Sequence, residues 1–217
     1  MFFSKSITFD QEDLGEAALV ANSTSVYSAI ENEFIERLKA GEAAAFDELV
    51  THYSANIYAL LLRLTEDEEE ARDLTQDTFL SALRAIKNFR GDADLKTWLY
   101  RIAVNESRNR FRWWKRRNKS SIISLDADSA FSQTPLSETI SDSAKNPEDE
   151  TLQRERERAL RKALSELPTN FREVIVLRDI EGLSYEEVAA ALDTNVGTVK
   201  SRIARGREEL RKKLSGF

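Results

Sequence analysis

The sequence GLSYEEVAAALDTNVGTVKSRIARGR, residues 182–207, decides how the C-terminal part of this chain folds. Ser184 stands where it can cap a helix, and Glu187, three residues further on, completes the pattern of a capping box. Residues 188–192 continue with an apolar helical stripe, which residues 193–195 interrupt with turn-forming residue types. The stretch therefore predicts two short helices joined by a tight turn, a helix-turn-helix.

The second helix of this motif has two different faces. Val196, Val199 and Ile203 recur at helical spacing and predict an apolar inner face. The outer face carries residue types that suit base edges and phosphates when such a helix enters the major groove of DNA. These candidate DNA-binding residues are Thr198, Lys200, Ser201, Arg202 and Arg205. The alternative is an ordinary helical hairpin with a solvated basic face.

Charge is segregated along the chain. The formal net charge of the 217 residues is −6, yet residues 108–119 and 200–213 are strongly basic. Acidic residues gather instead at positions 66–77 and 126–150. Such a separation suits a protein that meets phosphates with some faces and a basic protein partner with another.

Composition predicts the fold class. Seven Gly, three Pro and 32% charged residues, without a sustained alternation of apolar and polar positions, indicate an all-α protein. The length leaves room for two small domains. We expect a flexible N-terminal tail over residues 1–30, a helical domain over 31–117, a flexible linker over 118–150, and a second helical domain with the helix-turn-helix over 151–217.

Several classes of protein are disfavoured. Cys is absent, which leaves no disulfide, thiolate nucleophile or Cys-based zinc site. No apolar run approaches the length of a membrane span, and the N-terminus lacks the apolar core of a secretory signal, so we expect a cytoplasmic protein without membrane insertion. His52 is the single histidine, and no glycine-rich phosphate loop occurs. We therefore expect no enzyme, no metal and no cofactor.

Three further segments stand in a fixed order before the helix-turn-helix. They read DLTQDTFLSAL at residues 73–83, FRGDADLKTWLYRIAVN at residues 89–105 and LPTNFREVIVLR at residues 167–178. In this order they resemble the bacterial RNA polymerase sigma factors of the extracytoplasmic-function (ECF) type in the sigma-70 family. The resemblance begins at about residue 33 and leaves out the tail and the linker.

The resemblance implies two contacts with promoter DNA. The helix-turn-helix would read the minus-thirty-five element, with Arg207 placed for phosphates. The first domain would bind the minus-ten element and hold an unstacked base. The implied minus-ten residues are Phe89, Arg90, Asp92, Arg101, Asn105, Arg108 and Arg112. Trp113 and Trp114 are candidate stacking platforms, with a solvated basic helix end as the alternative. A position in the core is the alternative for Phe89 and the preferred interpretation for Trp98, with Leu99 and Ile102 beside it.

The resemblance also implies protein partners. One segment matches the motif that docks on the clamp helices of the largest subunit of core RNA polymerase. Its matching residues are Asp73, Gln76, Asp77 and Leu80. An anti-sigma factor is the second implied partner, and no cofactor is required.

Three other functions remain open at the level of sequence. A conventional helix-turn-helix regulator would bind duplex DNA without the polymerase and would not need the segment at residues 89–105. A helical adaptor without a DNA role would leave both basic blocks unexplained. A metal-dependent nuclease is the weakest alternative, because no carboxylates occur at a recognisable metal spacing.

Overall fold

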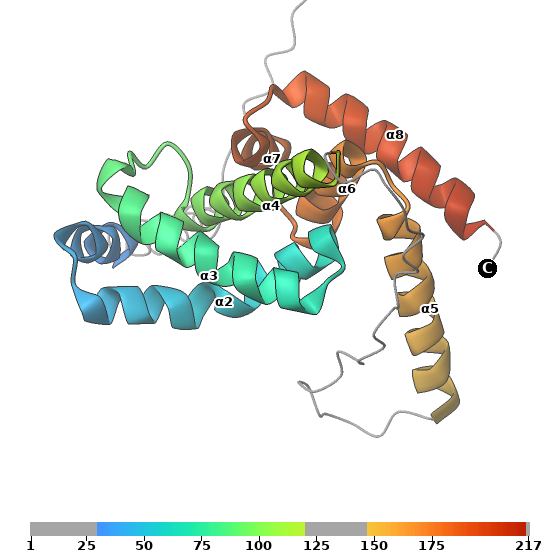
Figure 1. Ribbon diagram of the computed structural model, residues 1–217, viewed down its shortest axis with the longest axis horizontal. Coiled ribbons are helices and arrows are strands. Elements are labelled where there is room, and N and C mark those ends of the chain that lie inside the picture. Colours follow the sequence, from blue (N-terminus) through green and yellow to red (C-terminus); the bar gives the residue numbers. More distant parts are fainter. Residues whose placement is uncertain (1–29, 120–146, 216–217) are drawn as a thin grey trace, which may run out of the picture. The chain divides into compact units, whose positions relative to one another are not determined.

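The computed structural model describes residues 30–119 and 147–215, and every element in these two ranges is a helix. Residues 30–40 are helical. The elements after them, coloured from blue to red in Figure 1, are α2 (Ala43–Thr65), α3 (Glu68–Ala85), η1 (Ile86–Asn88), α4 (Leu95–Lys119), α5 (Pro147–Ser165), α6 (Thr169–Ile175), η2 (Val176–Ile180), α7 (Tyr185–Leu192) and α8 (Val196–Leu214). The all-α prediction is confirmed. The predicted tail and most of the predicted linker lie outside the described residues.

Contacts between Cα atoms divide the described residues into two compact units. Unit 1 contains residues 30–52 and 83–89. Unit 2 contains residues 53–82, 90–119 and 147–215. The division passes through α2 and α3, so each unit takes part of the range that sequence analysis assigns to one helical domain.

In unit 1, a tight turn at Gly41 joins the helix over residues 30–40 to α2. Gly41 has φ +81°, a conformation that favours glycine, and its amide donates to the carbonyl of Leu38 at 3.0 Å. Across this turn, Arg37 pairs with Glu42 at 3.0 Å and with Glu48 at 3.4 Å. The buried apolar side chains of the unit are Ile35, Leu38, Ala45, Leu49, Ile86 and Phe89.

In unit 2, α4 begins at a polar cap and buries one stripe. The amide of Thr97 donates to Asp94 Oδ1 at 2.6 Å, which satisfies a first-turn amide. The buried stripe consists of Leu95, Leu99, Tyr100, Ala103 and Val104. Leu99 is buried as expected. Trp98 and Ile102, the other predicted core residues of this helix, are half-buried, because they flank this stripe.

The C-terminal helices of unit 2 pack around α8. Helices α5, α6 and α7 all contact α8, and α7 also contacts α4. At Gly206 the approach of α8 to α6 is close, since a Cβ there would lie 3.0 Å from Ile175 Cγ1. Helix α5 begins at Pro147, a residue suited to a first helical position and three residues before the predicted end of the linker.

Helix α6 leads into a π-helical turn that the sequence did not predict. This turn, η2, ends with the amide of Glu181 donating to the carbonyl of Val176 at 2.9 Å. The five-residue spacing of donor and acceptor is that of a π-helix. Gly182, with φ +77°, follows this turn two residues before the cap of α7.

Candidate nucleic-acid interface

Local hydrogen bonds define both helices of the helix-turn-helix. Ser184 Oγ accepts from the amide of Glu187 at 3.1 Å, and Glu187 Oε2 accepts from the amide of Ser184 at 2.5 Å. The predicted capping box is therefore confirmed. Asp193 then takes the left-handed conformation (φ 51°), and Asn195 Oδ1 caps α8 by accepting from the amide of Thr198 at 2.7 Å.

The inner faces of the two helices are buried as the sequence predicted. Val188 and Leu192 of α7 are buried, as are Val199 and Ile203 of α8. Val196, at the start of α8, is half-buried. Because α7 and α8 are in contact, this apolar seam sets which side of α8 remains exposed.

Of the predicted DNA-binding residues of α8, Lys200, Ser201 and Arg205 are exposed, and Thr198 and Arg202 are half-buried. Thr198, Ser201, Arg202 and Arg205 follow the spacing i, i+3, i+4, i+7, which places them on one face. Lys200 lies on the opposite edge of the exposed side. Within the first group, Ser201 Oγ donates to the carbonyl of Thr198 at 2.9 Å.

Two cations, Lys200 and Arg178, lie near the ring of Tyr185, a residue for which the sequence predicted no role. The ammonium nitrogen of Lys200 is 5.5 Å from the centre of the Tyr185 ring, and the guanidinium carbon of Arg178 is 4.6 Å from it. Both distances fall within the range of cation–π contacts. The one signal for this cluster in the sequence was an aromatic residue directly after the cap of α7.

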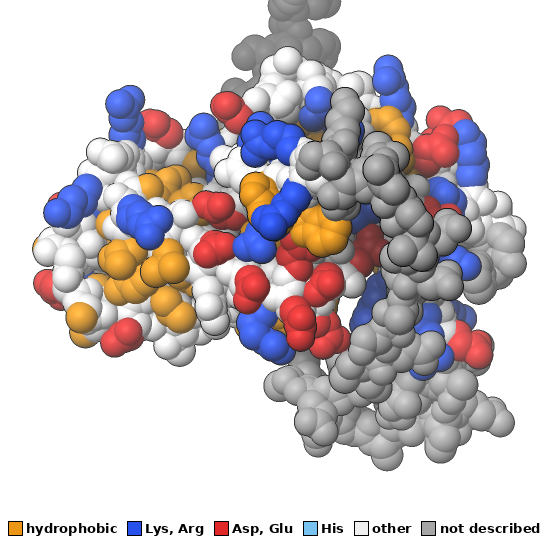
Figure 2. All heavy atoms as spheres, viewed as in Figure 1, with side chains coloured by type: hydrophobic (Ala, Val, Ile, Leu, Met, Phe, Trp, Pro, Cys, Tyr) orange, Lys and Arg blue, Asp and Glu red, His pale blue; other side chains and the backbone are white. Residues whose placement is uncertain are grey.

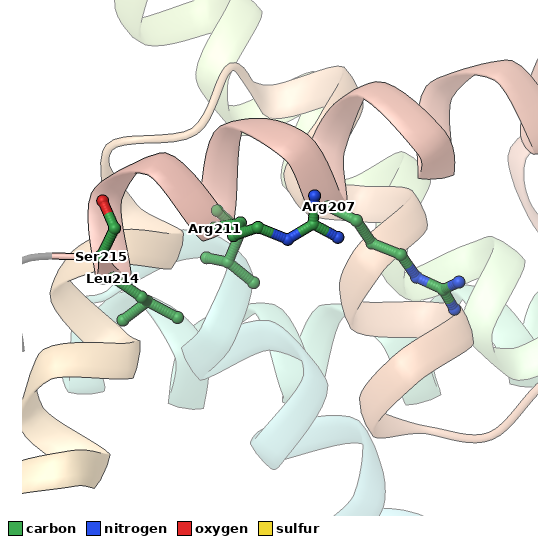
Figure 3. Close-up of a pocket in the computed structure, with 5 residues that line it drawn as sticks. Arg207, Arg211, Leu214 and Ser215 are labelled. Carbon is green, nitrogen blue, oxygen red and sulfur yellow. The ribbon is translucent and has the colours of Figure 1, made fainter.

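Arg207, predicted to hold phosphates, is paired within the protein. Its Nε donates to Asp179 Oδ2 at 3.0 Å, and its Nη2 donates to Asp179 Oδ1. These hydrogen bonds raise the pKa of Arg207 above its ordinary value. Arg207 and Arg211 also line a shallow depression near the end of α8, with Leu210, Leu214 and Ser215 (Figure 3). All five residues belong to one helix end, so the depression is not a cavity between elements.

The predicted minus-ten residues of α4 share one face. Arg101, Asn105, Arg108 and Arg112 follow the spacing i, i+4, i+7, i+11. Arg101, Asn105 and Arg112 are exposed and Arg108 is half-buried. Arg112 donates to Asn109 on the same helix, and Arg101 lies 3.6 Å from the carboxylate of Asp193.

Arg108 is held by a buried carboxylate. Its Nε and Nη2 donate to the two oxygens of Glu173 at 2.7 and 2.6 Å, and its Nη1 reaches the carbonyl of Leu192 at 3.5 Å. Glu173 is only 3% exposed. The hydrogen bonds to Glu173 raise the pKa of Arg108. A buried carboxylate needs such a partner, because an unpaired charge would be costly.

The remaining predicted minus-ten residues lie near the start of α4. Arg90 and Asp92 are exposed in unit 2, where Gly91 with φ +78° lies between them. Phe89, in unit 1, is 6% exposed. Little of its ring is therefore accessible to a base.

The far end of α4 exposes three large aromatic residues among basic ones. Phe111, Trp113 and Trp114 are 62%, 46% and 53% exposed. The guanidinium of Arg117 lies 4.8 Å from the centre of the Trp113 ring. Figure 2 shows basic and hydrophobic side chains mixed on one face, with acidic side chains beside them. Exposed aromatic faces among cations can stack on unpaired bases while the cations neutralise the backbone.

The predicted polymerase-docking residues lie on α3. Asp73, Gln76 and Leu80 are exposed, and Leu80 retains 49% exposure although it is apolar. Asp77 accepts from Arg110 Nη2 at 3.2 Å, which partly occupies its carboxylate. Leu80 is therefore an exposed apolar side chain among polar groups, a common feature of protein surfaces.

Two further groups of polar contacts stabilise unit 2. Glu181 accepts from Arg63 at 2.8 Å and from the Tyr100 hydroxyl at 2.7 Å. Burial and the neighbouring Glu181 raise the pKa of the Tyr100 hydroxyl. Arg172 pairs with Glu66 at 2.6 Å and donates to the carbonyl of Leu64 at 3.0 Å.

No metal site is evident among residues 30–119 and 147–215. Those residues contain no group of three or more His, Asp or Glu side chains arranged to hold a metal ion. None of the described helices is long and apolar enough to cross a membrane. His52 is exposed on α2.

Two family models match the chain. The model for Sigma-70 region 2 matches residues 49–117, and the model for Sigma-70, region 4 matches residues 157–210. The second match contains the helix-turn-helix, and the first contains α3 and most of α4.

Curated relatives match most of the chain. The RNA polymerase sigma-H factor of Pseudomonas aeruginosa is 38% identical over 184 residues, which covers 85% of this chain and 93% of that protein. The ECF RNA polymerase sigma-E factor of Haemophilus influenzae is 38% identical over 181 residues, with 83% and 93% covered.

Solved structures agree with this similarity. The structure of CnrH in complex with the cytosolic domain of CnrY has a TM-score of 0.60 and 26% identity, covering 86% of this chain and 97% of CnrH. The sigma factor RpoE in complex with the anti-sigma factor NepR from Bartonella quintana has a TM-score of 0.60 and 27% identity, covering 78% of this chain and 96% of that one.

Proposed function

The chain belongs to the sigma-70 family, as an alternative sigma factor of the ECF type that directs RNA polymerase to promoters, and we propose that three of its surfaces divide this work. The observation that carries the function is the 38% identity to sigma factors across 93% of their length. The sigma factors of this family act as transcription initiation factors rather than as enzymes. Two of the proposed surfaces contact promoter DNA, and the third contacts the polymerase.

The exposed side of α8 binds the minus-thirty-five element in this proposal. Thr198, Ser201, Arg202 and Arg205 supply one face, and Lys200 supplies its opposite edge. Arg and Lys can donate to the O6 and N7 atoms of guanine, and Ser and Thr can donate to bases or phosphates. The helix-turn-helix supports this assignment because it leaves this side of α8 outside the apolar seam.

The basic face and far end of α4 bind the minus-ten element. Exposed Arg101, Asn105 and Arg112 can contact the strand, and the rings of Trp113 and Trp114 offer faces for unstacked bases. Arg90 and Asp92 are exposed nearby in the sequence, before α4. Two predicted minus-ten residues have internal roles: Phe89 is buried, and Arg108 is paired with Glu173. Arg108 can contact the DNA only if a phosphate displaces the Glu173 carboxylate from it.

Helix α3 docks on the clamp helices of the largest subunit of core RNA polymerase. Asp73 and Gln76 supply polar contacts, Leu80 supplies apolar area, and Asp77 shares its carboxylate with Arg110. A protein that works with the polymerase works where transcription occurs, so we propose a cytoplasmic location. An anti-sigma factor is the second proposed protein partner, because RpoE of Bartonella quintana forms such a complex.

A conventional helix-turn-helix regulator accounts for less of the chain. It would need residues 157–210 but gives no reason for the match of residues 49–117 to Sigma-70 region 2. The comparisons therefore favour the sigma factor over this alternative.

The decisive test is run-off transcription with purified core RNA polymerase on a pool of bacterial promoter fragments. We expect initiation that requires the protein and is lost in a Lys200→Ala, Arg202→Ala double variant. Lys212→Ala is the matched control, since it removes an exposed cation from the same helix that is paired with Glu208 and Glu209. Duplex binding without initiation or polymerase binding would overturn the proposal in favour of a regulator.

Polymerase docking needs its own variant. Leu80→Asp places a charge in the proposed apolar contact and should abolish co-purification with core polymerase. Leu160→Asp makes the same change at another exposed leucine, on α5, and should leave co-purification intact. Equal behaviour of the two variants would remove α3 from the proposed docking surface.

A further inference from the structure

The ring of Tyr185, on the first helix of the helix-turn-helix, contacts Lys200, a cation of the proposed DNA-binding surface. It is the first residue of α7, directly after the capping residue Ser184, and its side chain is half-buried. The centre of its ring lies 5.5 Å from the ammonium of Lys200 and 4.6 Å from the guanidinium carbon of Arg178. Lys200 belongs to α8, so the ring links the two helices of the motif.

The Tyr185 ring is held by its surroundings. The capping box of Ser184 and Glu187 sets the start of α7, and Arg178 donates to the carbonyl of Leu183 at 2.5 Å. Arg178 therefore bridges the residue before the cap and the ring of Tyr185. A ring fixed in this way can hold a mobile cation in one place.

Contact with an aromatic ring can limit the positions that the Lys200 ammonium takes. A lysine ammonium is a compact charge on a flexible stem of four carbons, whereas an arginine carries a rigid fork that is already organised for binding. Lys200 is also exposed and lies on the edge of α8 away from Thr198, Ser201, Arg202 and Arg205. Without the ring, its ammonium would sample many positions before reaching an acceptor.

We propose that Tyr185 is a positioning residue for promoter recognition, whose ring holds the Lys200 ammonium where that ammonium meets an acceptor of the minus-thirty-five DNA. The inference rests on the proposed function of α8. The acceptor is a base edge, such as guanine O6 and N7, or a backbone phosphate, and both present the same negative potential to an ammonium. Base substitutions distinguish the two, because only a base acceptor changes with sequence.

The test compares full-length variants in run-off transcription with core polymerase, on a promoter recovered with the unaltered protein. Tyr185→Phe keeps the ring and should stay within the error of the unaltered protein. Tyr185→Leu removes the ring and should lower the yield of run-off transcript by about two- to five-fold, the size of an exposed cation–π contact. In the Lys200→Ala background, Tyr185→Leu should cost less than it does alone, because the supported cation is gone.

Promoters with single base substitutions in the minus-thirty-five element identify the acceptor. With a base acceptor, Tyr185→Leu and Lys200→Ala should relax the preference at the same position. With a phosphate acceptor, both variants should weaken all promoters alike. Relaxation by the two variants at different positions would overturn the proposal.

Two other results would also overturn it. If Tyr185→Phe loses as much as Tyr185→Leu, the hydroxyl and not the ring is responsible. If Tyr185→Leu costs the same with and without Lys200, the two residues act independently. A protein that supports no initiation at all defeats the proposed function instead, which keeps the two failures apart.

Nuclear magnetic resonance tests the contact without transcription. The ring current of Tyr185 should shift the Cε protons of Lys200 upfield in the full-length protein. The shift should persist in Tyr185→Phe and disappear in Tyr185→Leu, while the thermal midpoint reports whether Tyr185→Leu remains folded. A Lys200 signal that is the same in all three proteins would show that the ring does not hold the ammonium.

Discussion

Two carboxylates of unit 2 each bind an arginine through both oxygens, but one carboxylate is buried and the other is partly exposed. Glu173 is 3% exposed and binds Arg108 through both oxygens. Asp179 binds Arg207 through both oxygens as well, although the two side chains are 29% and 49% exposed. Burial removes the screening by water that weakens surface ion pairs. The two pairs should therefore differ in how much free energy of unfolding is lost when one partner is removed.

Glu173→Gln should therefore destabilise the protein more than Asp179→Asn. Loss of a buried, charge-assisted hydrogen-bond pair costs about 2 kcal/mol, whereas an exposed ion pair contributes less than about 1 kcal/mol. Chemical denaturation of both variants measures the difference. If both variants lose the same free energy of unfolding, burial of Glu173 does not strengthen its pairing with Arg108.

Two lysines lower the pKa of the Glu166 side chain. The hydrogen bond from Lys213, at 2.7 Å, lowers this pKa, and the charges of Lys213 and Lys162 lower it further. A carboxyl with a lowered pKa stabilises the fold above its unfolded-state pKa, and this contribution disappears as the pH falls through the folded-state pKa. Glu166 therefore favours folding at neutral pH and ceases to do so in acid.

Lys213→Met should raise the pKa of Glu166 toward its ordinary value, with Lys162 retaining part of the effect. Titration of the side-chain carboxyl carbon by nuclear magnetic resonance measures this pKa directly. Lys212→Met is the control, because Lys212 pairs with Glu208 and Glu209 instead. A pKa that stays in place in Lys213→Met would rule out the hydrogen bond as its cause.

Among the elements, α8 depends on a single glycine for its packing. A Cβ at Gly206 would lie 3.0 Å from Ile175 Cγ1 and 3.3 Å from Phe171 Cβ, both on α6. Gly206 itself is buried. The residue lets α8 approach α6 closely, and α8 carries the proposed minus-thirty-five surface.

Gly206→Val should destabilise the protein by about 1–3 kcal/mol, the usual cost of overpacking a closely packed interior. Gly197→Ala is the matched control on the same helix, because its Cβ would meet only Asn195 Oδ1, at 3.4 Å. Thermal and chemical unfolding measure both variants. A Gly206→Val protein as stable as the unaltered one would mean that α6 moves aside without cost.

Elements could be predicted from the sequence where the responsible residues are close along the chain. The capping box joins Ser184 to Glu187, and the turn before α8 ends at Asn195, so both follow from local chemistry. The pairing of Arg108 with Glu173, 65 residues away, could not be foreseen, because it depends on how helices pack. The π-helical turn at residues 176–180 was equally hidden, since no local residue type specifies it.

The same limit applies to the candidate interface. Polar residues of α8 could be assigned to its outer side, because the apolar spacing of Val199 and Ile203 identifies the inner one. The contact between Lys200 and Tyr185 could not be assigned, since it requires the relative placement of α7 and α8. For Phe89 the motif left open both a base-binding and a core position, and its 6% exposure favours the core.

The whole molecule carries a net negative charge, as does the DNA that it is proposed to bind. The net charge is −6, so attraction to DNA depends on local basic surfaces and not on the total charge. Each phosphate that a cation neutralises releases about 0.9 of a condensed counterion from duplex DNA. The slope of log affinity against log salt concentration therefore gives the number of phosphates that the protein contacts.

Arg205→Ala should reduce the slope of log affinity against log salt concentration by about one unit, the expected contribution of one phosphate contact. Binding of the polymerase with the protein or its variant, titrated over a range of salt concentrations, measures the slope. Lys212→Ala should leave the slope unchanged, because Glu208 and Glu209 already flank that ammonium. An unchanged slope in Arg205→Ala would assign Arg205 to a base or to no contact.

The pairing of Arg108 with Glu173 changes what a phosphate contact through this guanidinium would contribute. A phosphate can take Arg108 only by exchanging places with a carboxylate that binds it at 2.6 and 2.7 Å. In that exchange one anion replaces another on the same cation, and Glu173, which is 3% exposed, loses the partner that compensates its buried charge. The contact would still release a counterion from the DNA, so Arg108 would add to the salt dependence of promoter binding while adding little to the affinity.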